Sequence, residues 1–143
     1  MPYDPMLVQP MREEMTSMKA EELMDAAAVE AFMARAGTKL LFVNSVCGCA
    51  AGQARPALRL ALQHVTKPDH VGTVFAGQDL EAVARARACF AQVPPSSPSV
   101  ALFKGEDLVF FMPRHMIESR DANAIAFDLV SAFDKHCVPA TAS

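Results

Sequence analysis

Apolar residues form two patterns along this chain: short continuous runs, and longer stretches in which they recur every three or four positions. The run from Leu40 to Val46 is partly β-branched and too short for a stable helix, so it predicts a buried strand. Shorter runs predict strands at residues 70–75, 100–103 and 108–112. A helical stretch separates the first two strands, which should therefore be parallel. A turn at residues 104–107 joins the last two, which should be antiparallel.

Helical periodicity accounts for most other apolar positions. It predicts a helix at residues 6–18, with a start or a kink near Pro10. A second helix is expected at residues 25–36, with Asp25 as the N-cap and Gly37 as the stop. Further helices are expected at about residues 50–65, 79–90 and 121–137, and Pro56 should kink the first of these or mark where its regular part begins. The side chains expected to face the core are Leu7, Met11, Met15 and Met18; Val29, Phe32, Met33 and Ala36; Leu58, Leu62 and Val65; Leu80, Val83 and Phe90; and Ile125, Leu129, Val130 and Phe133.

The candidate chemistry lies at Cys47-Gly48-Cys49, where the first long strand ends and a helical pattern begins. At a helix N-terminus, unpaired N–H groups and the positive end of the helix dipole stabilise a thiolate. A disulfide between cysteines that flank one residue would be strained and easily reduced, and Gly48 is best able to adopt the backbone angles of so small a ring. The pair therefore favours redox activity. Cys47, which meets the helix first, should be the more exposed and more acidic thiol.

Composition limits the partners and the cellular compartment that we expect for this chemistry. A net charge of −3 over 143 residues gives no reason to expect nucleic acid or an anionic membrane as a partner. No apolar run reaches the roughly 20 residues of a membrane helix, and no signal peptide is expected. Four cysteines do not make a secreted disulfide framework in a chain of this size. We therefore expect a cytoplasmic protein, in a compartment where close cysteine pairs are usually catalytic, redox-sensing or metal-binding.

The order of elements, β-α-β-α-β-β-α with a cysteine motif after the first strand, resembles the thioredoxin fold. The resemblance implies an α/β protein with a four-stranded mixed central sheet flanked by helices. Residues 1–143 would form one domain, with a helical extension at residues 1–38 and a frayed tail at residues 138–143. In that fold a cis proline precedes the third strand and lies beside the active cysteines. Pro98 holds the matching position, so the resemblance implies a cis Ser97–Pro98 bond that helps to align an incoming chain.

Several longer motifs extend the resemblance from the fold to one protein family. They are VNSVCGCAAG at residues 43–52, ARP at 54–56, TVFAGQD at 73–79, PPSSPS at 94–99, LFKG at 102–105 and PRH at 113–115. Together with AFDKHC at residues 132–137, these motifs are similar to the bacilliredoxin family over nearly the whole chain.

That resemblance implies a thiol–disulfide oxidoreductase of the bacterial cytoplasm that removes bacillithiol, a low-molecular-weight thiol, from mixed disulfides on client proteins. Cys47 would attack the bacillithiol sulfur, free the client thiol and take up the cap. Cys49, or a second bacillithiol, would then resolve the new mixed disulfide. No tightly bound cofactor is implied, and bacillithiol is the exchanging thiol. A low-molecular-weight thiol or a reductase would recycle the protein.

Other interpretations of the cysteines remain open from the sequence. Cys47 and Cys49 could be buried structural thiols, or metal ligands with His115 and Cys137, although zinc usually takes four ligands and no paired motif completes the set. The protein could also be a redox-sensing or binding module, or a general disulfide reductase or isomerase. Cys89 has the pattern of a small hydrophobic residue on a helix.

Charged and polar neighbours of the motif also allow more than one interpretation. Arg55 could assist electrostatically or bind a carboxylate of the exchanging thiol, or it could be a solvated surface residue. His115 could tune a thiolate, but the end of the last hairpin need not reach the cysteines. Cys137 could be an auxiliary redox thiol or an inert terminal residue. Asn44 and Ser45 could form local hydrogen bonds at the strand end.

Overall fold

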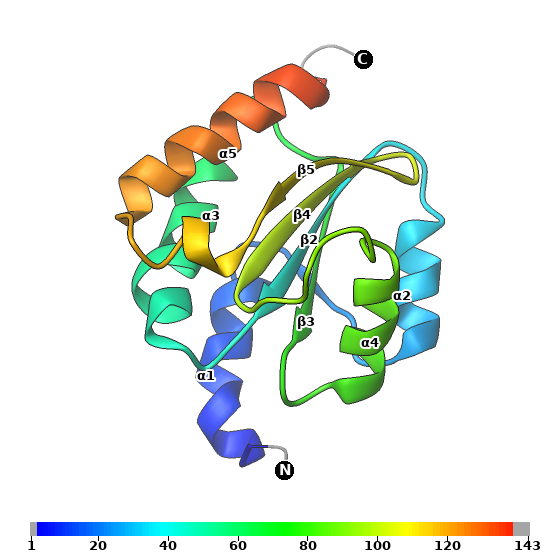
Figure 1. Ribbon diagram of the computed structural model, residues 1–143, viewed down its shortest axis with the longest axis vertical. Coiled ribbons are helices and arrows are strands. Elements are labelled where there is room, and N and C mark those ends of the chain that lie inside the picture. The colour runs from blue at the N-terminus through cyan, green and yellow to red at the C-terminus, as the bar shows by residue number, and fades with distance from the viewer. Residues whose placement is uncertain (1–2, 139–143) are drawn as a thin grey trace.

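A five-stranded mixed sheet with the order β1-β3-β2-β4-β5 forms the centre of the computed structural model, which describes residues 3–138 (Figure 1). Its strands are β1 (Glu21–Glu22), β2 (Thr38–Asn44), β3 (His70–Phe75), β4 (Ser99–Lys104) and β5 (Asp107–Met112). The α-helices are α1 (Pro5–Thr16), α2 (Ala26–Met33), α3 (Arg55–Ala61), α4 (Leu80–Ala88) and α5 (Ala122–His136). A π-helix, η1 (Ala50–Ala54), precedes α3, and a 3-10 turn, η2 (Arg114–Met116), follows β5.

Helices cover both faces of the sheet, α3 and α5 on one side and α2 and α4 on the other (Figure 1). β2 shows why its sequence is a continuous apolar run. Leu40 and Phe42 belong to the apolar cluster beneath α3 and α5, whereas Leu41 and Val43 belong to the cluster beneath α2 and α4. A strand buried on both faces needs apolar side chains in both directions. None of the helices within residues 3–138 is long and apolar enough to cross a bilayer.

The strand pairings agree with the sequence analysis, except for one added strand. β2 is parallel to β3 and antiparallel to β4, and β4 is antiparallel to β5. The expected four-stranded sheet is wrong by one strand, because Glu21 and Glu22 pair in parallel with Gly72 and Thr73 of β3. Two glutamates carry no apolar pattern. Their pairing is accompanied by ion pairs of Glu21 with Arg35 and Glu22 with Arg12, which a search for apolar runs does not detect.

Several helix bounds and faces also differ from the expected ones. α1 begins at Pro5 and contains Pro10, and it buries Val8 and Met15 rather than the exposed Leu7. α2 ends at Met33, and Ala36 is exposed. The helix expected to reach residue 65 ends at Ala61. Val65, beyond the end of α3, and Leu80, the first residue of α4, are exposed rather than facing the core. Of the expected tail, Val138 is exposed and residues 139–143 lie outside the described part.

Candidate active site

Cys47 and Cys49 lie where β2 gives way to a helical segment, as the sequence predicts. β2 ends at Asn44, helical geometry begins at Gly48, and the backbone N–H groups of Ala50 and Ala51 donate to the Cys47 carbonyl. From Ala50 to Ala54 this segment is the π-helix η1, a form found mostly as single turns and often at functional sites. Regular α-helix starts at Arg55, with Pro56 in its first turn, so Pro56 marks the start of the regular part.

The two thiols have different surroundings. Their sulfurs are 2.9 Å apart and hydrogen-bonded, with both cysteines free. Cys47 is half-buried, whereas only 8% of Cys49 is exposed. Hydrogen bonds from the Cys49 thiol and the Cys49 backbone N–H lower the pKa of Cys47. Burial, followed by the interaction with Cys47, raises the pKa of Cys49. Cys47 is thus the more exposed and more acidic thiol, in the predicted order.

A buried arginine holds the loop that carries the motif. Only 2% of Arg55 is exposed, which excludes the solvated surface position considered above. Its Nη1 donates to Asn44 Oδ1 at 2.8 Å and to the Ser45 carbonyl at 3.0 Å, and its Nε is 2.6 Å from Glu14 Oε2. These bonds direct the guanidinium into the protein. Arg55 therefore organises the loop instead of presenting its charge to a thiol substrate.

The same network continues to the motif itself. Asn44 Oδ1 accepts from the Ser45 backbone N–H at 2.9 Å, and Ser45 Oγ accepts from the Cys47 backbone N–H at 3.0 Å. Asn44 Nδ2 also donates to the Met11 carbonyl of α1. The local hydrogen bonds expected of Asn44 and Ser45 are confirmed. The sequence did not show that they join α1 and α3 to the backbone of Cys47.

The Ser97–Pro98 peptide bond is cis, as expected from the resemblance to the thioredoxin fold. Pro98 is buried and directly precedes β4. Ser99 Oγ donates to the Ser96 carbonyl at 3.0 Å and closes the loop around the two residues of that bond. β4 is the neighbour of β2 in the sheet, and the register pairs Ser99 with Val43, so this loop comes to the same edge of the sheet as the cysteine motif.

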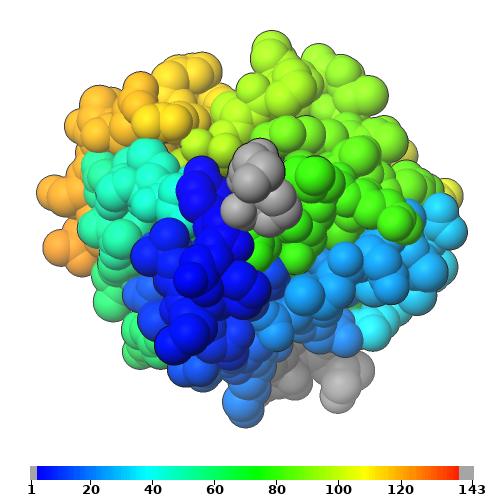
Figure 2. Space-filling model, turned by 90° about the horizontal axis from the view of Figure 1, so that it is seen from below, coloured from blue at the N-terminus to red at the C-terminus, as the bar shows by residue number. Residues whose placement is uncertain are grey.

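Arg114 is a site residue that the sequence analysis missed. The sequence left open whether the end of the last hairpin reaches the cysteines. Next to the hydrogen bonds from Cys49, the positive charge of Arg114 also contributes to the lowered pKa of Cys47. The register offered a signal, because Val100 pairs with Met112 and the segment after β5 must return to the edge where β4 begins. In Figure 2 the segments around residues 50 (teal), 97 (yellow-green) and 115 (yellow to orange) meet on one face.

The other candidate residues from the sequence are Cys137, Cys89 and His115. Cys137 follows α5 and interacts with Thr38 at the start of β2, the end opposite the motif, and burial raises its pKa. Cys89 packs with the cluster beneath α2 and α4, and burial raises its pKa as well. His115 is exposed on η2. Within residues 3–138, no group of three or more Cys, His, Asp or Glu side chains is arranged to hold a metal ion.

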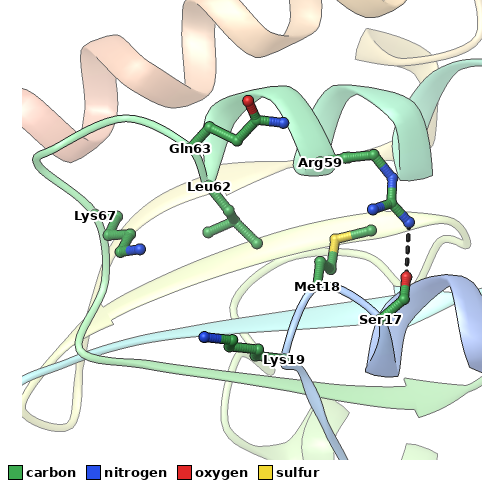
Figure 3. Close-up of a pocket in the computed structure, with 7 residues that line it drawn as sticks. All are labelled: Ser17, Met18, Lys19, Arg59, Leu62, Gln63 and Lys67. Atoms are coloured by element: carbon green, nitrogen blue, oxygen red, sulfur yellow. Dashed lines mark hydrogen bonds between the residues drawn. The ribbon is translucent and has the colours of Figure 1, made fainter.

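A separate pocket of about 240 Å³ lies at the far end of α3 (Figure 3). Arg59, Lys19 and Lys67 give it a basic lining, and Arg59 Nη2 is 2.7 Å from Ser17 Oγ. Neither Cys47 nor Cys49 lines it. The candidate active site is therefore the edge formed by the motif, the Pro98 loop and η2, and not this basic pocket.

Comparison with known proteins identifies the family. Residues 3–137 match the family model described as "Disulphide isomerase". A bacilliredoxin of Shouchella clausii is 53% identical over 136 residues, which cover 94% of each chain. The chain belongs to the bacilliredoxin family. Bacilliredoxins of Geobacillus kaustophilus, 51% identical over 94% of each chain, and Cytophaga hutchinsonii, 50% identical over 93% of this chain and 98% of that one, are also similar.

Solved structures show the fold independently of the family. A thioredoxin of Malassezia sympodialis superimposes with a TM-score of 0.55 at 12% identity, covering 82% of this chain and 90% of that one. A protein titled Trxlp from Edwardsiella tarda gives a TM-score of 0.54 at 19% identity, covering 77% of this chain and 98% of that one. This bacilliredoxin family member has a thioredoxin-like fold and is a thiol–disulfide oxidoreductase.

Proposed function

We propose that the protein removes bacillithiol from mixed disulfides on client cysteines, with Cys47 as the attacking thiol and Cys49 as the resolving thiol. The observation that carries the assignment is the asymmetry of the pair. The more exposed cysteine has the lowered pKa, and the buried one, with the raised pKa, keeps its sulfur 2.9 Å away. An attacking thiol needs exposure and thiolate character, whereas a resolving thiol needs proximity.

The proposed chemistry balances as two exchange steps. The Cys47 thiolate attacks the bacillithiol sulfur, a Cys47–bacillithiol disulfide forms, and the client leaves as a thiolate that takes a proton from water. The Cys49 thiol then loses its proton, attacks the Cys47 sulfur and releases bacillithiol as the reduced thiol. The protein is left with a Cys47–Cys49 disulfide, and a low-molecular-weight thiol or a reductase must supply two electrons to recycle it.

Neighbouring residues support these steps in the proposal. The Arg55 network positions the Cys47 backbone, and Gly48 allows the small ring to close. The Ser97–Pro98 segment would align the client chain in an extended form beside the motif. No tightly bound cofactor is needed, because bacillithiol itself is the exchanging group. A reducing cytoplasm would supply both the clients and the recycling thiol.

Mass spectrometry of the protein after mixing with a bacillithiolated client tests the assignment. We expect Cys49→Ser to accumulate bacillithiol on Cys47, and Cys47→Ser to leave the client capped. Full activity of Cys47→Ser would overturn the mechanism. Repeated release of client thiol by one protein molecule in the presence of a reductant separates an enzyme from a redox sensor, which changes state once per oxidation.

A general disulfide isomerase or reductase is the second candidate, because the matching family model carries the description "Disulphide isomerase". The two functions differ in substrate. At equal concentrations, the proposed function predicts faster turnover of a bacillithiolated client than of a scrambled protein disulfide. Equal rates, or a preference for the scrambled disulfide, would favour the general activity.

A further inference from the structure

Arg114 is held beside the Pro98 loop by its backbone. It is the first residue of η2, separated from the end of β5 by Pro113 alone, and its N–H donates to Ser96 Oγ at 3.2 Å. Ser96 lies two positions before Pro98, in the loop that Ser99 Oγ closes. The position of Arg114 is thus tied to the segment that meets the cysteine motif at the sheet edge.

The other side of the same segment is tied to the helix that follows the motif. Gln53 Nε2, in η1, lies within 3.0 Å of the carbonyl oxygens of Ile117, Glu118 and Arg120. Ile117 is fully buried and belongs to the apolar cluster that contains Cys49. Residues 114–120 therefore form a fixed border of the motif, and Arg114 does not sit on a free loop.

The side chain of Arg114 remains available to a ligand. It is 47% exposed, and its Nε is 3.1 Å from Glu118 Oε2. Glu118 takes the Nε side of the guanidinium, while the charge still acts on both sulfurs. By contrast, the buried Arg55 uses its guanidinium within the protein. Unlike Arg55, Arg114 can thus meet a group arriving from solvent.

We propose that Arg114 forms a subsite for an anionic group, such as a carboxylate, on the small thiol that passes from the client to Cys47. The inference rests on the proposed function insofar as a small thiol is transferred. A guanidinium pairs well with a carboxylate, often through two parallel hydrogen bonds. The subsite would hold the thiol carrier while its sulfur exchanges the bond to the client for a bond to Cys47, and the client leaves as a thiolate that water protonates.

One peptide cysteine coupled through a disulfide to different small thiols tests this directly. Mercaptopropionate supplies a carboxylate, mercaptopropanol a neutral group of similar length, and cysteamine a cation. The quantity measured is the ratio of the rates at which the wild-type protein and its variants release the peptide thiol from the first two adducts. Any effect of Arg114 on the Cys47 thiolate is common to all adducts, so it cancels in this ratio.

We expect Arg114→Gln to lower the mercaptopropionate to mercaptopropanol ratio about threefold to fivefold, the scale of a partly exposed ion pair. Arg114→Glu should lower it further and raise the relative rate of the cysteamine adduct. Glu118→Gln, which frees the guanidinium, should maintain or increase the ratio. Lys67→Gln, in the basic pocket at the far end of α3, removes the same charge at a distance and should leave the ratio unchanged.

The outcomes separate this subsite from the function on which it rests. If Arg114→Gln slows all adducts equally, Arg114 acts only on the thiolate and the subsite is refuted. If Lys67→Gln lowers the ratio as much as Arg114→Gln, general electrostatic attraction replaces the subsite. If the ratio responds as expected but bacillithiolated clients are not preferred over scrambled disulfides, the subsite stands and the proposed function fails.

Discussion

Cys47 and Cys49 carry the same functional group two positions apart, yet their surroundings separate their acidity. Hydrogen bonds from Cys49 lower the pKa of Cys47, whereas burial raises the pKa of Cys49. Because alkylation requires the thiolate, the rate for Cys47 should rise with pH to half its maximum below the value of about 8.5 of a free cysteine. Iodoacetamide labelling resolved by peptide mass spectrometry measures this. Faster labelling of Cys49 than of Cys47 at neutral pH would contradict the assignment.

A substitution at Gly48 tests whether the reduced protein and the protein with a Cys47–Cys49 disulfide need different backbone angles at this position. A Cβ at this position meets no atom within 4 Å, and Gly48 is not among the residues with a positive φ. We therefore expect Gly48→Ala to leave the free energy of unfolding of the reduced protein unchanged or up to about 1 kcal/mol higher, because alanine favours helical backbone. Closing the Cys47–Cys49 ring should become slower, since glycine offers the wider range of angles.

Gly52→Ala is the matched control for this substitution. Gly52 lies in η1, and a Cβ added there would also meet no atom within 4 Å. Denaturant unfolding gives the stability of both variants, and quenched mass spectrometry gives the rate at which a mixed disulfide on Cys47 becomes the internal disulfide. A loss of stability in reduced Gly48→Ala, with Gly52→Ala unaffected, would show that the reduced form already needs glycine.

At the scale of elements, the Arg55 network links α1, β2 and α3 to the motif. Arg55→Met keeps most of the side-chain volume but leaves Asn44, the Ser45 carbonyl and Glu14 without their donor. We expect a loss of about 2–4 kcal/mol in the free energy of unfolding, because buried partners of a charged donor are costly to leave unpaired. The pH profile of Cys47 alkylation should also shift, since the network ends on the Cys47 backbone N–H.

Arg59→Met provides the comparison within the same helix. Arg59 is exposed and its side chain bonds to Ser17 Oγ and the Glu14 carbonyl. Its loss should cost less than about 1 kcal/mol and leave the alkylation profile unchanged. Chemical denaturation and labelling of both variants check the pair. A shifted alkylation profile in both, or in neither, would argue that Arg55 contributes packing but does not position Cys47.

Elements with a strong apolar pattern were the ones that the sequence predicted well. β2, β3, β4 and β5 lie within two residues of their expected bounds at both ends. The failures have identifiable causes. Glu21 and Glu22 form a strand through pairing alone, and Pro10 is accommodated inside α1 even though its ring removes a backbone donor. Such outcomes depend on which neighbours complete the structure, and periodicity carries no information about them.

The candidate active site shows the same contrast between features that local sequence patterns predict and features that depend on distant segments. Cys47, Gly48 and Cys49 could be located from a strand that runs into a helix, and the cis bond at Pro98 was implied by the resemblance to the thioredoxin fold. Arg55 was singled out from the sequence with its role left open, and its burial could not be predicted, because that burial depends on partners from β2 and from α1, which is distant in sequence. Placing Arg114 near the motif required knowledge of the pairing register of β4 and β5. Charges contributed by a distant segment are the part of a site that local motifs reveal least.

At the scale of the whole molecule, one buried cation links stability to pH. Lys39 in β2 is fully buried, and its Nζ donates to the Arg35 carbonyl. Burial lowers its pKa, and the nearby Glu106 and Asp69 oppose the shift only in part. Between the lowered pKa of the folded state and the usual value of about 10.4, the unfolded chain binds more protons than the folded one. The Lys39 contribution therefore makes the protein more stable as pH rises through this window.

Lys39→Met removes this dependence while keeping an unbranched apolar stem of similar length. We expect the variant to match or exceed the stability of the wild type near pH 7, by on the order of 1 kcal/mol, because it buries no charge. Its advantage should shrink as pH rises toward 10, where the wild-type lysine becomes neutral in the folded state. Other groups that titrate in this range, including Cys89 and Cys137, are present in both proteins and cancel in the difference. Urea unfolding at a series of pH values measures the difference in the free energy of unfolding between Lys39→Met and the wild type. Substitution of the exposed Lys104 by Met is the control. An advantage that grows with pH would mean that the attraction of Lys39 to Glu106 and Asp69 outweighs the cost of its burial.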